Sequence, residues 1–287
     1  MAKASVDIII PVHNAADTLE RCLDSVAAQT FDGWRALLIN DRSTDESPEI
    51  LRRYAEKDSR FVPMESGRDP GASGTRNCGL TKIAADWVTF LDADDWWEPS
   101  MLETLLNTAE STDSDVVQCD YIIEYPGGTQ AAESPMFDAV RVFEKDEFDT
   151  ILEKMLAGIS MNSIWKKIVR ADLVRGLEFD TRLRTAEDLL FNFNLLLRAS
   201  RWTFIPDRLY HYYRSGATLT GSSLSFKAKW QCNRIVSTEI ARRLKGTSLD
   251  SPKHRLQSFL RPYRITIPKL LRMVRDRKNR DQRPETG

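Results

Sequence analysis

The chain has 287 residues, and its 41 lysines and arginines nearly balance its 42 aspartates and glutamates. Hydrophobic residues make up 41% of it, which is enough for one large α/β domain with a sizeable core. No apolar run approaches the roughly 20 residues that a membrane span needs. From Pro252 onward, eleven basic residues stand against three acidic ones, so this segment carries +8 and the preceding chain −9. Because that body is acidic, we expect no nucleic-acid partner.

The spacing of the cysteines and the first residues of the chain indicate the cellular compartment of the protein. The four cysteines are far apart and form no Cys-x-x-Cys pair, which argues against a zinc site or a redox motif. Residues 1–5 lead directly into an apolar run and do not resemble a signal peptide. We therefore expect a cytoplasmic protein with reduced thiols.

Strand and helix patterns alternate four times in about the first 110 residues. Short apolar runs predict strands at residues 6–10, 34–39, 61–64 and 87–91. The alternation predicts an α/β fold with a mainly parallel sheet and helices on both faces. Ligands bind such sheets at the carboxyl ends of the strands, so polar residues at those ends are the first candidates for a site.

The second half of the chain is less regular. Residues 116–123 predict a strand, and residues 187–199 predict a helix with one apolar side. Residues 223–244 and 251–281 also have helical patterns, although two prolines interrupt the latter.

Three aspartates directly follow the fourth predicted strand, as Asp92-Ala93-Asp94-Asp95. Carboxylates this close repel one another unless a cation or hydrogen-bond donors offset their charge. Mg²⁺ and Mn²⁺ prefer oxygen ligands and typically bridge protein carboxylates to substrate phosphates. The pattern favours a divalent metal site here. The alternative is a solvated acidic loop in which one aspartate caps the helix that Pro99 opens.

Polar residues also follow the first two predicted strands. The carboxylate of Asp41 can accept hydrogen bonds from a base or a ribose, and an Asx-type turn is the less favoured alternative for it. For Thr44, Asp45 and Ser47, we expect an Asx-type turn before the next helix. His13 follows the first strand, and its ring could stack on a base. By itself, His13 is more simply interpreted as a surface histidine.

Four motifs, taken together in their order along the chain, resemble those of a known family, although no single motif is specific by itself. They are Pro11-Val12-His13-Asn14, Asn40-Asp41-Arg42-Ser43-Thr44-Asp45, Arg76-Asn77-Cys78-Gly79-Leu80 and Phe90-Leu91-Asp92-Ala93-Asp94-Asp95. Their order and spacing resemble those of family 2 glycosyltransferases, which have the GT-A fold. The similarity is strong from residue 5 to 106, resumes at 165–167, 179–180 and 187–191, and fades after Arg214. It implies a GT-A fold and an inverting enzyme that transfers a sugar from a nucleotide-diphosphate donor, most commonly a UDP-sugar, to an acceptor hydroxyl.

The resemblance implies donor-binding roles for residues that match the first two motifs. Pro11, His13 and Asn14 would belong to the nucleotide site, with His13 stacking on the base where the family commonly has tyrosine. Asp41 would hydrogen-bond the base, uracil being commonest. Arg42 stands where the family commonly has glycine, so the local turn departs from the family's pattern.

The same resemblance assigns the metal site. Asp92 and Asp94 match the family's Asp-x-Asp pair. Asp92 would lie near the ribose and the metal's waters, and Asp94 would ligate Mn²⁺ or Mg²⁺ directly. Arg76 would face the donor, and an ion pair with a neighbouring carboxylate is the alternative.

Glu187-Asp188 matches the position of the family's catalytic base. An acceptor hydroxyl is a poor nucleophile until a carboxylate takes its proton, and Asp188 would be that base. With a metal stabilising the leaving diphosphate, one base suffices for an inverting transfer. The alternative for Asp188 is an acid in a first helical turn, favoured by the helix dipole. Arg214, at the end of a predicted strand, is a weaker candidate for binding the donor.

The implied organisation is a GT-A catalytic domain over residues 1–222, with a nucleotide-sugar half (1–115) and an acceptor half (116–222), followed by a helical basic extension (223–287). Apolar residues lie among arginines and lysines over 252–283, which is typical of an amphipathic segment on an anionic membrane. Packing against the body is the alternative. Because acceptors in this family are often lipid-linked glycans, we expect a glycan or lipid-linked acceptor, a role in polysaccharide or glycoconjugate biosynthesis, and peripheral contact with the inner face of the plasma membrane.

Two other functions fit parts of the sequence. A nucleotidyltransferase that makes nucleotide sugars has a similar sheet, but it usually carries a glycine-rich, arginine-containing loop where this chain has His13-Asn14-Ala15-Ala16. A non-enzymatic, basic membrane-binding module would explain the tail and leave the clustered aspartates unexplained.

Overall fold

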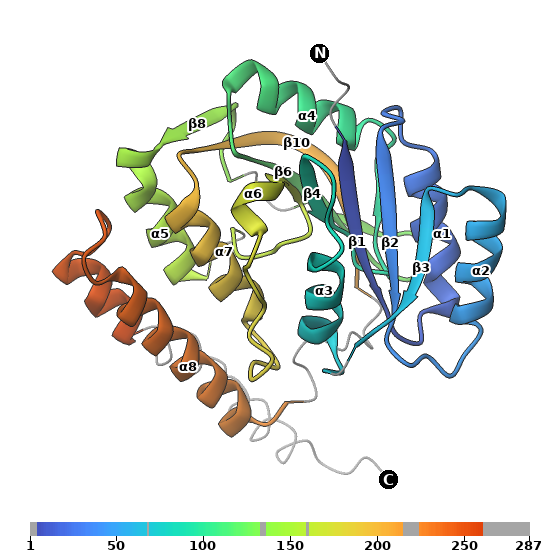
Figure 1. Ribbon diagram of the computed structural model, residues 1–287. Helices are drawn as coiled ribbons and strands as arrows, with labels where there is room; N and C mark the ends of the chain where they lie inside the picture. The colour runs from blue at the N-terminus through green and yellow to red at the C-terminus, as the bar shows by residue number, and fades with distance from the viewer. Residues whose placement is uncertain (1–4, 68, 133–135, 159–160, 215–223, 261–287) are drawn as a thin grey trace, which may run out of the picture.

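A computed structural model describes residues 5–67, 69–132, 136–158, 161–214 and 224–260. One large sheet crosses the molecule, with helices on both faces (Figure 1). Its strands are β1 (Val6–Val12), β2 (Trp34–Asn40), β3 (Phe61–Glu65), β4 (Trp87–Phe90), β5 (Trp96–Trp97), β6 (Val116–Glu124), β7 (Gln130–Ala131), β8 (Arg141–Glu144), β9 (Lys167–Arg170) and β10 (Arg201–Tyr213). The helices are α1 (Ala16–Ala27), α2 (Ser47–Lys57), α3 (Ala72–Leu80), α4 (Met101–Thr112), η1 (Lys145–Glu147), α5 (Phe148–Ala157), α6 (Ala171–Val174), α7 (Glu187–Arg198) and α8 (Phe226–Leu244).

The strand order is β3-β2-β1-β4-β9-β6-β10-β5, with β7 beside β6 and β8 beside β10. β1 pairs in parallel with β2 and β4, and β2 pairs in parallel with β3, which confirms the arrangement predicted for the first half. β9 lies between β4 and β6 and runs antiparallel to both, so β6 has the direction of β4. β10 is parallel to β6. The carboxyl ends of β1, β2, β4, β6 and β10 therefore lie along one edge of the sheet.

The central strand β1 is apolar on both sides because each side faces its own core. Ile8 and Ile10 are fully buried with side chains from α1, α2 and α4, whereas Ile9 is fully buried in the cluster that α5 and α7 complete. α3 lies close to this second side because Gly79 has no side chain, and a Cβ there would be 2.7 Å from Ile9 Cγ2. Helices thus cover both faces, as the α/β pattern predicts.

α8 packs beside α7 on the second core (Figure 1). Its residues Val236, Ile240 and Leu244 are buried in the same cluster as the apolar side of α7. The helix predicted at 223–244 is confirmed over Phe226–Leu244, and its apolar side is part of the main core.

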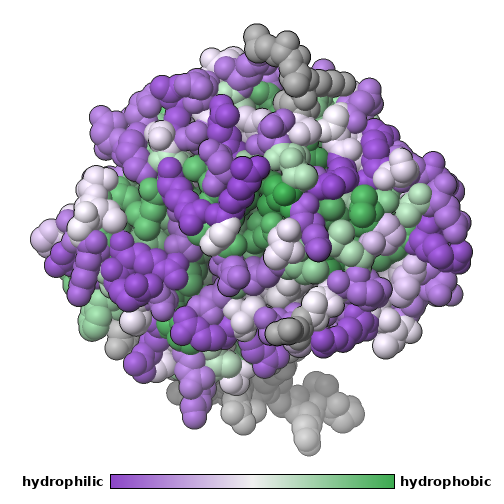
Figure 2. All heavy atoms as spheres, in the orientation of Figure 1, coloured by the Kyte–Doolittle hydropathy of each residue, from purple (hydrophilic) through white to green (hydrophobic). Residues whose placement is uncertain are grey.

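The basic segment is described only in part. Residues 252–260 form a helix, on which Leu256 and Phe259 are 57% and 65% exposed. Residues 261–283 and the domain boundary predicted at 222–223 lie outside the described residues. In the described part of the chain, no helix has both the length and the apolar character needed to cross a membrane. Figure 2 shows that the face in view is largely hydrophilic, with hydrophobic atoms near its centre.

Candidate active site

The residues singled out from the sequence meet at one edge of the sheet. Asn14 and Asp41 follow β1 and β2, and Asp92 comes two residues after β4. Arg76 lies in α3, and Asp188 lies in the first turn of α7. Because parallel strands end at the same edge, residues far apart in the sequence are brought together here.

Asp41 is buried, and its carboxylate holds the loop that leads into α3. Oδ1 accepts a hydrogen bond from the Ser66 hydroxyl at 2.8 Å, and Oδ2 accepts one from the Gly71 amide at 2.6 Å. Nδ1 of His13 lies 2.7 Å from the Asp41 carbonyl oxygen. Because a carbonyl oxygen only accepts, this ring nitrogen is the donor. The His13 ring is thus held against the backbone of Asp41, while the Asp41 carboxylate faces the loop that leads into α3.

The loop after β2 is tied to the loop after β1. Asn14 Oδ1 accepts a hydrogen bond from the Thr44 amide at 2.8 Å. Asp45 Oδ1 accepts one from the Ser47 amide at 3.0 Å, which confirms an Asx-type turn ahead of α2. Arg42 adopts a left-handed φ of 55°. The turn thus keeps a backbone conformation that glycine adopts more readily than arginine does.

Asp95 is fully buried and fixes the aspartate loop to β10. Its carboxylate accepts hydrogen bonds from the Tyr210 hydroxyl at 2.6 Å and from the Tyr213 amide at 2.7 Å. The Tyr210 oxygen in turn accepts a hydrogen bond from the Asp92 amide at 3.4 Å. The residue before α4 is Ser100, so no aspartate of this loop caps that helix and the capping alternative is wrong.

Asp94 and Asp92 carry the other two carboxylates of this loop. Burial and the nearby charge of Asp92 raise the pKa of Asp94 to about 6. Arg21 donates to the Asp94 carbonyl oxygen at 3.1 Å and not to its carboxylate. Within the described residues, no group of three His, Cys, Asp or Glu side chains is placed to hold a metal ion. Two carboxylates supplemented by phosphate oxygens would suit the ligand preference of Mg²⁺ or Mn²⁺.

Arg76 is buried among three carboxylates. Its Nη2 donates to Asp92 Oδ1 at 2.7 Å, and its Nη1 lies 3.6 Å from Asp188 Oδ1 and 3.7 Å from Glu187 Oε1. Burial acts to lower the pKa of the guanidinium, but the charges of Asp92, Asp188 and Glu187 raise it above its ordinary value. Arg76 thus forms an ion pair with a neighbouring carboxylate and joins the loop after β4 to α7.

One carboxylate oxygen of Asp188 accepts a hydrogen bond, and the other is buried beside the Arg76 guanidinium. Its Oδ2 accepts a hydrogen bond from the Ile164 amide at 3.4 Å, and its Oδ1 has no hydrogen-bond partner among the described residues. The side chain is 21% exposed. Burial raises the pKa of Asp188 to about 7, although the charge of Arg76 opposes the shift. A carboxyl that titrates near neutral pH is suited to act as a general base.

Arg214 lies one residue beyond β10, at the same edge of the sheet. Its amide donates to the Glu124 carbonyl at 2.8 Å, and its guanidinium carbon lies 5.6 Å from the centre of the Tyr212 ring. Residues 215–223, which follow Arg214, lie outside the described residues. Arg214 does not belong to the ion-pair cluster of Arg76.

The sequence interpretation missed a group of aromatic side chains at this edge. The Trp165 ring lies parallel to that of Tyr212, with 5.5 Å between their centres, and 4.4 Å from that of Tyr210. Tyr121 packs edge-on against Trp165 at 5.3 Å. Tyr210 and Tyr212 alternate along β10 and therefore lie on one face of the sheet, which is the signal that could have revealed the group.

His211, on the opposite face of β10, is held by the protein on both of its ring nitrogens. Nδ1 lies 2.8 Å from Glu124 Oε1, and Nε2 lies 2.9 Å from Glu98 Oε1. The ring also stacks on Trp96 at 5.0 Å. These contacts give His211 a structural role in joining β5, β6 and β10.

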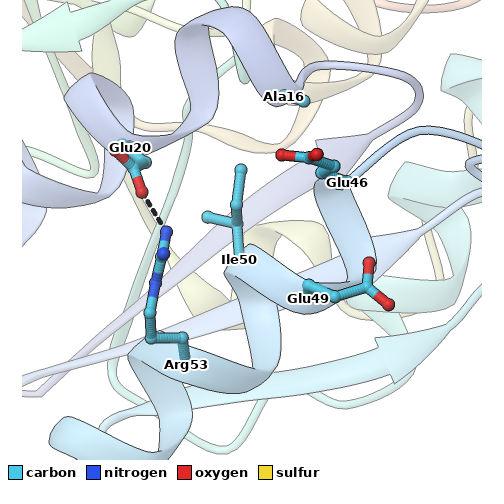
Figure 3. A pocket seen from close by; sticks show the side chains of 6 residues that line it. All are labelled: Ala16, Glu20, Glu46, Glu49, Ile50 and Arg53. Atoms are coloured by element: carbon cyan, nitrogen blue, oxygen red, sulfur yellow. Dashed lines mark hydrogen bonds and ion pairs between the residues drawn. The ribbon is translucent and has the colours of Figure 1, made fainter.

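A hollow lies between α1 and α2 (Figure 3). Glu20 and Arg53 form an ion pair across it. Its lining residues are Ala16, Glu20, Glu46, Glu49, Ile50 and Arg53. None of these lining residues is a candidate site residue from the sequence motifs.

The mixed sheet with helices on both faces is a GT-A fold. The family model described as "Glycosyl transferase family 2" matches residues 7–173. The chain belongs to glycosyl transferase family 2.

Curated relatives agree with this assignment. "Putative glycosyltransferase EpsH" of Bacillus subtilis (strain 168) is 28% identical over 216 residues, which cover 74% of this chain and 61% of that protein. "Cholesterol galactosyltransferase" of Borreliella burgdorferi is 29% identical over 240 residues, which cover 81% of this chain and 67% of that protein. This chain thus spans about three fifths of the length of the EpsH protein.

Two solved structures share the fold. Staphylococcus aureus TarS 1-349 in complex with UDP-GlcNAc aligns with a TM-score of 0.71 and 20% identity, over 90% of this chain and 72% of that one. The mannosyltransferase PcManGT from Pyrobaculum calidifontis in complex with GDP-Man and Mn²⁺ aligns with a TM-score of 0.59 and 16% identity, over 92% of this chain and 70% of that one.

Proposed function

We propose that this protein is an inverting glycosyltransferase that transfers a sugar from a nucleotide-diphosphate donor, a UDP-sugar, to a hydroxyl of a glycan or lipid-linked acceptor. One observation carries the proposal: the buried guanidinium of Arg76 joins Asp92, on the proposed donor side, to Asp188, the proposed base. Sugar transfer needs the breaking bond and the departing proton to lie close together. Membership of glycosyl transferase family 2 supports this reaction.

The nucleotide would bind at the ends of β1 and β2. His13 would stack on the base, and Asp41 would accept a hydrogen bond from it. Pro11 and Asn14 would complete this wall of the site. The hydrogen bond between the His13 ring and the Asp41 backbone carbonyl, which holds these two residues together at the ends of β1 and β2, supports the assignment. A UDP-GlcNAc complex of a structure with the same fold supports uridine as the base.

Asp94, with Asp92 beside it, would hold Mn²⁺ or Mg²⁺. The raised pKa of Asp94 supports this, because a cation would relieve the repulsion between the two carboxylates. The Mn²⁺ complex of a structure with the same fold is a second support. Such an ion supplies Lewis-acid stabilisation of the leaving diphosphate.

Asp188 would take the proton of the acceptor hydroxyl as that oxygen attacks the anomeric carbon. The bond between this carbon and the diphosphate oxygen then breaks, and a single displacement inverts the configuration. The pKa of Asp188, which burial raises to about 7, supports this role. Arg76 balances the charges of Asp92, Glu187 and Asp188 during this step. Arg214 would lie near the donor phosphates.

The biological setting is part of the proposal. We place the enzyme in polysaccharide or glycoconjugate biosynthesis, on the cytoplasmic side, with peripheral contact to the plasma membrane through residues 252–283. Eleven basic residues in the last 36 support attraction to anionic lipids. The division into a catalytic domain (1–222) and a basic extension (223–287) belongs to the same proposal.

A nucleotide panel tests the donor site. We expect UDP with Mn²⁺ to raise the unfolding temperature more than GDP, dTDP or CMP, and EDTA to remove most of the rise, because a ligand that binds only the folded state stabilises it. Release of UDP from a UDP-sugar distinguishes transfer from nucleotidyl transfer, which would release pyrophosphate from a nucleoside triphosphate. The absence of a shift with every nucleotide would contradict the donor site.

A further inference from the structure

Lys167, the first residue of β9, is a fully buried lysine that the proposed reaction does not use. Its Nζ donates hydrogen bonds to Asn192 Oδ1 at 2.8 Å and to the Met161 carbonyl at 3.3 Å, and it lies 4.9 Å from the centre of the Trp202 ring. All three of these groups are uncharged. Burying an amine among uncharged groups is unfavourable, so general stability does not account for a lysine at this position.

The hydrogen bonds of Lys167 lead to the proposed base. Asn192 lies on α7, one turn after Asp188, and its Nδ2 donates to the Asn162 carbonyl at 2.7 Å. Two residues further along the chain, the Ile164 amide donates to Asp188 Oδ2 at 3.4 Å. Lys167 and Asn192 therefore join α7 to the segment that contacts the Asp188 carboxylate.

Lys167 is itself fixed in the sheet. β9 lies between β4 and β6, and the Lys167 carbonyl accepts a hydrogen bond from the Thr89 hydroxyl of β4 at 2.8 Å. On the other side of the base, the Arg76 guanidinium of α3 lies 3.6 Å from Asp188 Oδ1. The carboxylate is thus placed from two directions, by Arg76 and by the connection that starts at Lys167.

We propose that Lys167 is a positioning residue for the base: through Asn192 and residues 161–164, it sets where the Asp188 carboxylate lies relative to the acceptor hydroxyl. This inference rests on the proposed function, in which Asp188 is that base. The two hydrogen bonds of Lys167 need only two N–H groups, so a neutral amine donates both of them as an ammonium ion does.

The groups that act on the Asp188 carboxyl make this role measurable. Burial raises its pKa most and two nearby carboxylates raise it further, whereas the Arg76 guanidinium and the Ile164 amide lower it. The two carboxylates are those of Glu187 and Asp92. Loss of Lys167 loosens the Ile164 contact and removes an attraction between Lys167 and Asp188, and both changes raise the pKa of Asp188.

Lys167→Met tests the proposal, because methionine keeps an unbranched side chain and lacks the nitrogen. The assay is the release of UDP by the full chain with saturating Mn²⁺, from whichever of UDP-glucose, UDP-galactose and UDP-GlcNAc the unmodified chain turns over fastest. We expect kcat to fall by roughly tenfold or more, and the midpoint of the pH dependence of kcat/KM to move upward by about 0.5–1 pH unit. The KM for the donor and the UDP-induced rise in unfolding temperature should stay unchanged, which also shows that the variant is folded.

Asn192→Ala breaks the same connection and leaves Lys167 in place. It should lower kcat and move the pH midpoint in the same direction. Because two changes within one connection are not additive, the double variant Lys167→Met/Asn192→Ala should be no slower than the slower single variant. If Lys167→Met does not fold, the kcat and the pH midpoint of Asn192→Ala decide the question.

Lys145→Met is the matched control. The Lys145 Nζ donates to three backbone carbonyls at the other end of α7, those of Leu196, Leu197 and Ala199. This variant also removes a lysine that holds α7, so the unfolding temperature should fall, but the pH midpoint should not move.

Three outcomes would overturn the inference while leaving the proposed function standing. They are an unmoved pH midpoint in the folded Lys167→Met or Asn192→Ala variant, an equal movement of the midpoint in Lys145→Met, and additive losses of kcat in the double variant. An unmodified chain that neither binds UDP nor releases it from any UDP-sugar would instead refute the proposed function, and the inference with it.

Discussion

Asn77 and Phe179 exchange two hydrogen bonds across 102 residues of sequence. The Asn77 Nδ2 donates to the Phe179 carbonyl at 2.9 Å, and its Oδ1 accepts from the Phe179 amide at 2.7 Å. The Phe179 ring stacks on Phe191 of α7, with 4.0 Å between the ring centres. This pair joins α3, which carries Arg76, to α7, which carries Asp188.

Replacing Asn77 with Ala should therefore loosen this connection. The change removes two hydrogen bonds and leaves a backbone amide and a carbonyl without partners, so we expect the free energy of unfolding to fall by about 2–3 kcal/mol. Urea unfolding measures the loss. Asn107→Ala, at an exposed position of α4, is the control and should change the free energy by less than about 0.5 kcal/mol. Equal stability of the two variants would show that the Asn77 contact is dispensable.

Asp188→Asn should stop sugar transfer and leave donor binding intact. A positioned base contributes about 10²–10⁴-fold to the rate, and an amide cannot accept the proton. The readouts are the turnover number and the UDP-induced rise in unfolding temperature. Asp17→Asn, which changes an exposed acid in the first turn of α1, controls for the helix dipole. Turnover of Asp188→Asn within a few-fold of the unmodified protein would refute its role as base.

The pH dependence of transfer should report on Asp188. Burial raises the pKa of this carboxyl to about 7, and only its deprotonated form can act as a base. The rate should therefore increase as the pH rises through 7, and kcat/KM at pH 8 should be about tenfold that at pH 6. Saturating Mn²⁺ at each pH keeps metal binding from limiting the rate. A profile that is flat from pH 5.5 to 8 would exclude a base with this pKa.

Asp94→Asn should abolish the Mn²⁺-dependent part of nucleotide binding without weakening the fold. The raised pKa of Asp94 means that its ionised form is disfavoured in the folded protein. This unfavourable contribution grows as the pH rises through about 6, so at pH 8 the variant should be at least as stable as the unmodified protein. Thermal unfolding at pH 8, with UDP and with either Mn²⁺ or EDTA, measures both effects. A UDP shift that is still sensitive to EDTA would place the metal elsewhere.

Asp95→Ala should have the opposite effect on stability. Its carboxylate accepts two hydrogen bonds from β10, at 2.6 and 2.7 Å, so its loss should lower the free energy of unfolding by about 2 kcal/mol or more. Comparing it with Asp94→Asn separates the anchoring aspartate from the proposed metal ligand. Similar unfolding curves for the two variants would argue against this division of roles.

Membrane contact through residues 252–283 can be tested on the full chain. Each basic residue near an anionic surface contributes about 1 kcal/mol, and salt screens the attraction. We expect co-sedimentation with phosphatidylglycerol vesicles at low ionic strength, release at high salt, and no binding to neutral phosphatidylcholine vesicles. Failure to bind the anionic vesicles at low salt would rule out this contact.

The sequence predicted the first half of the fold well because its signals are local. Four apolar runs, each ending in polar residues, indicated parallel strands, and the structure confirms them as β1 to β4. The Asx-type turn after β2 was predicted from adjacent residues and is confirmed. The aspartate cap considered for the helix near Pro99 was wrong. The buried aspartate of this loop, Asp95, accepts hydrogen bonds from Tyr210 and Tyr213 instead, and the residue before the helix is a serine.

The sequence by itself determined which residue types stand at the strand ends, because an apolar strand followed by carboxylates is visible in a few consecutive letters. Only the tertiary structure decided their partners. The antiparallel β9 separates β4 from β6 and brings Trp165 to the site, and Arg76 meets Asp188 across more than a hundred residues of chain. Such contacts depend on how whole elements pack against one another, and no local periodicity records that packing.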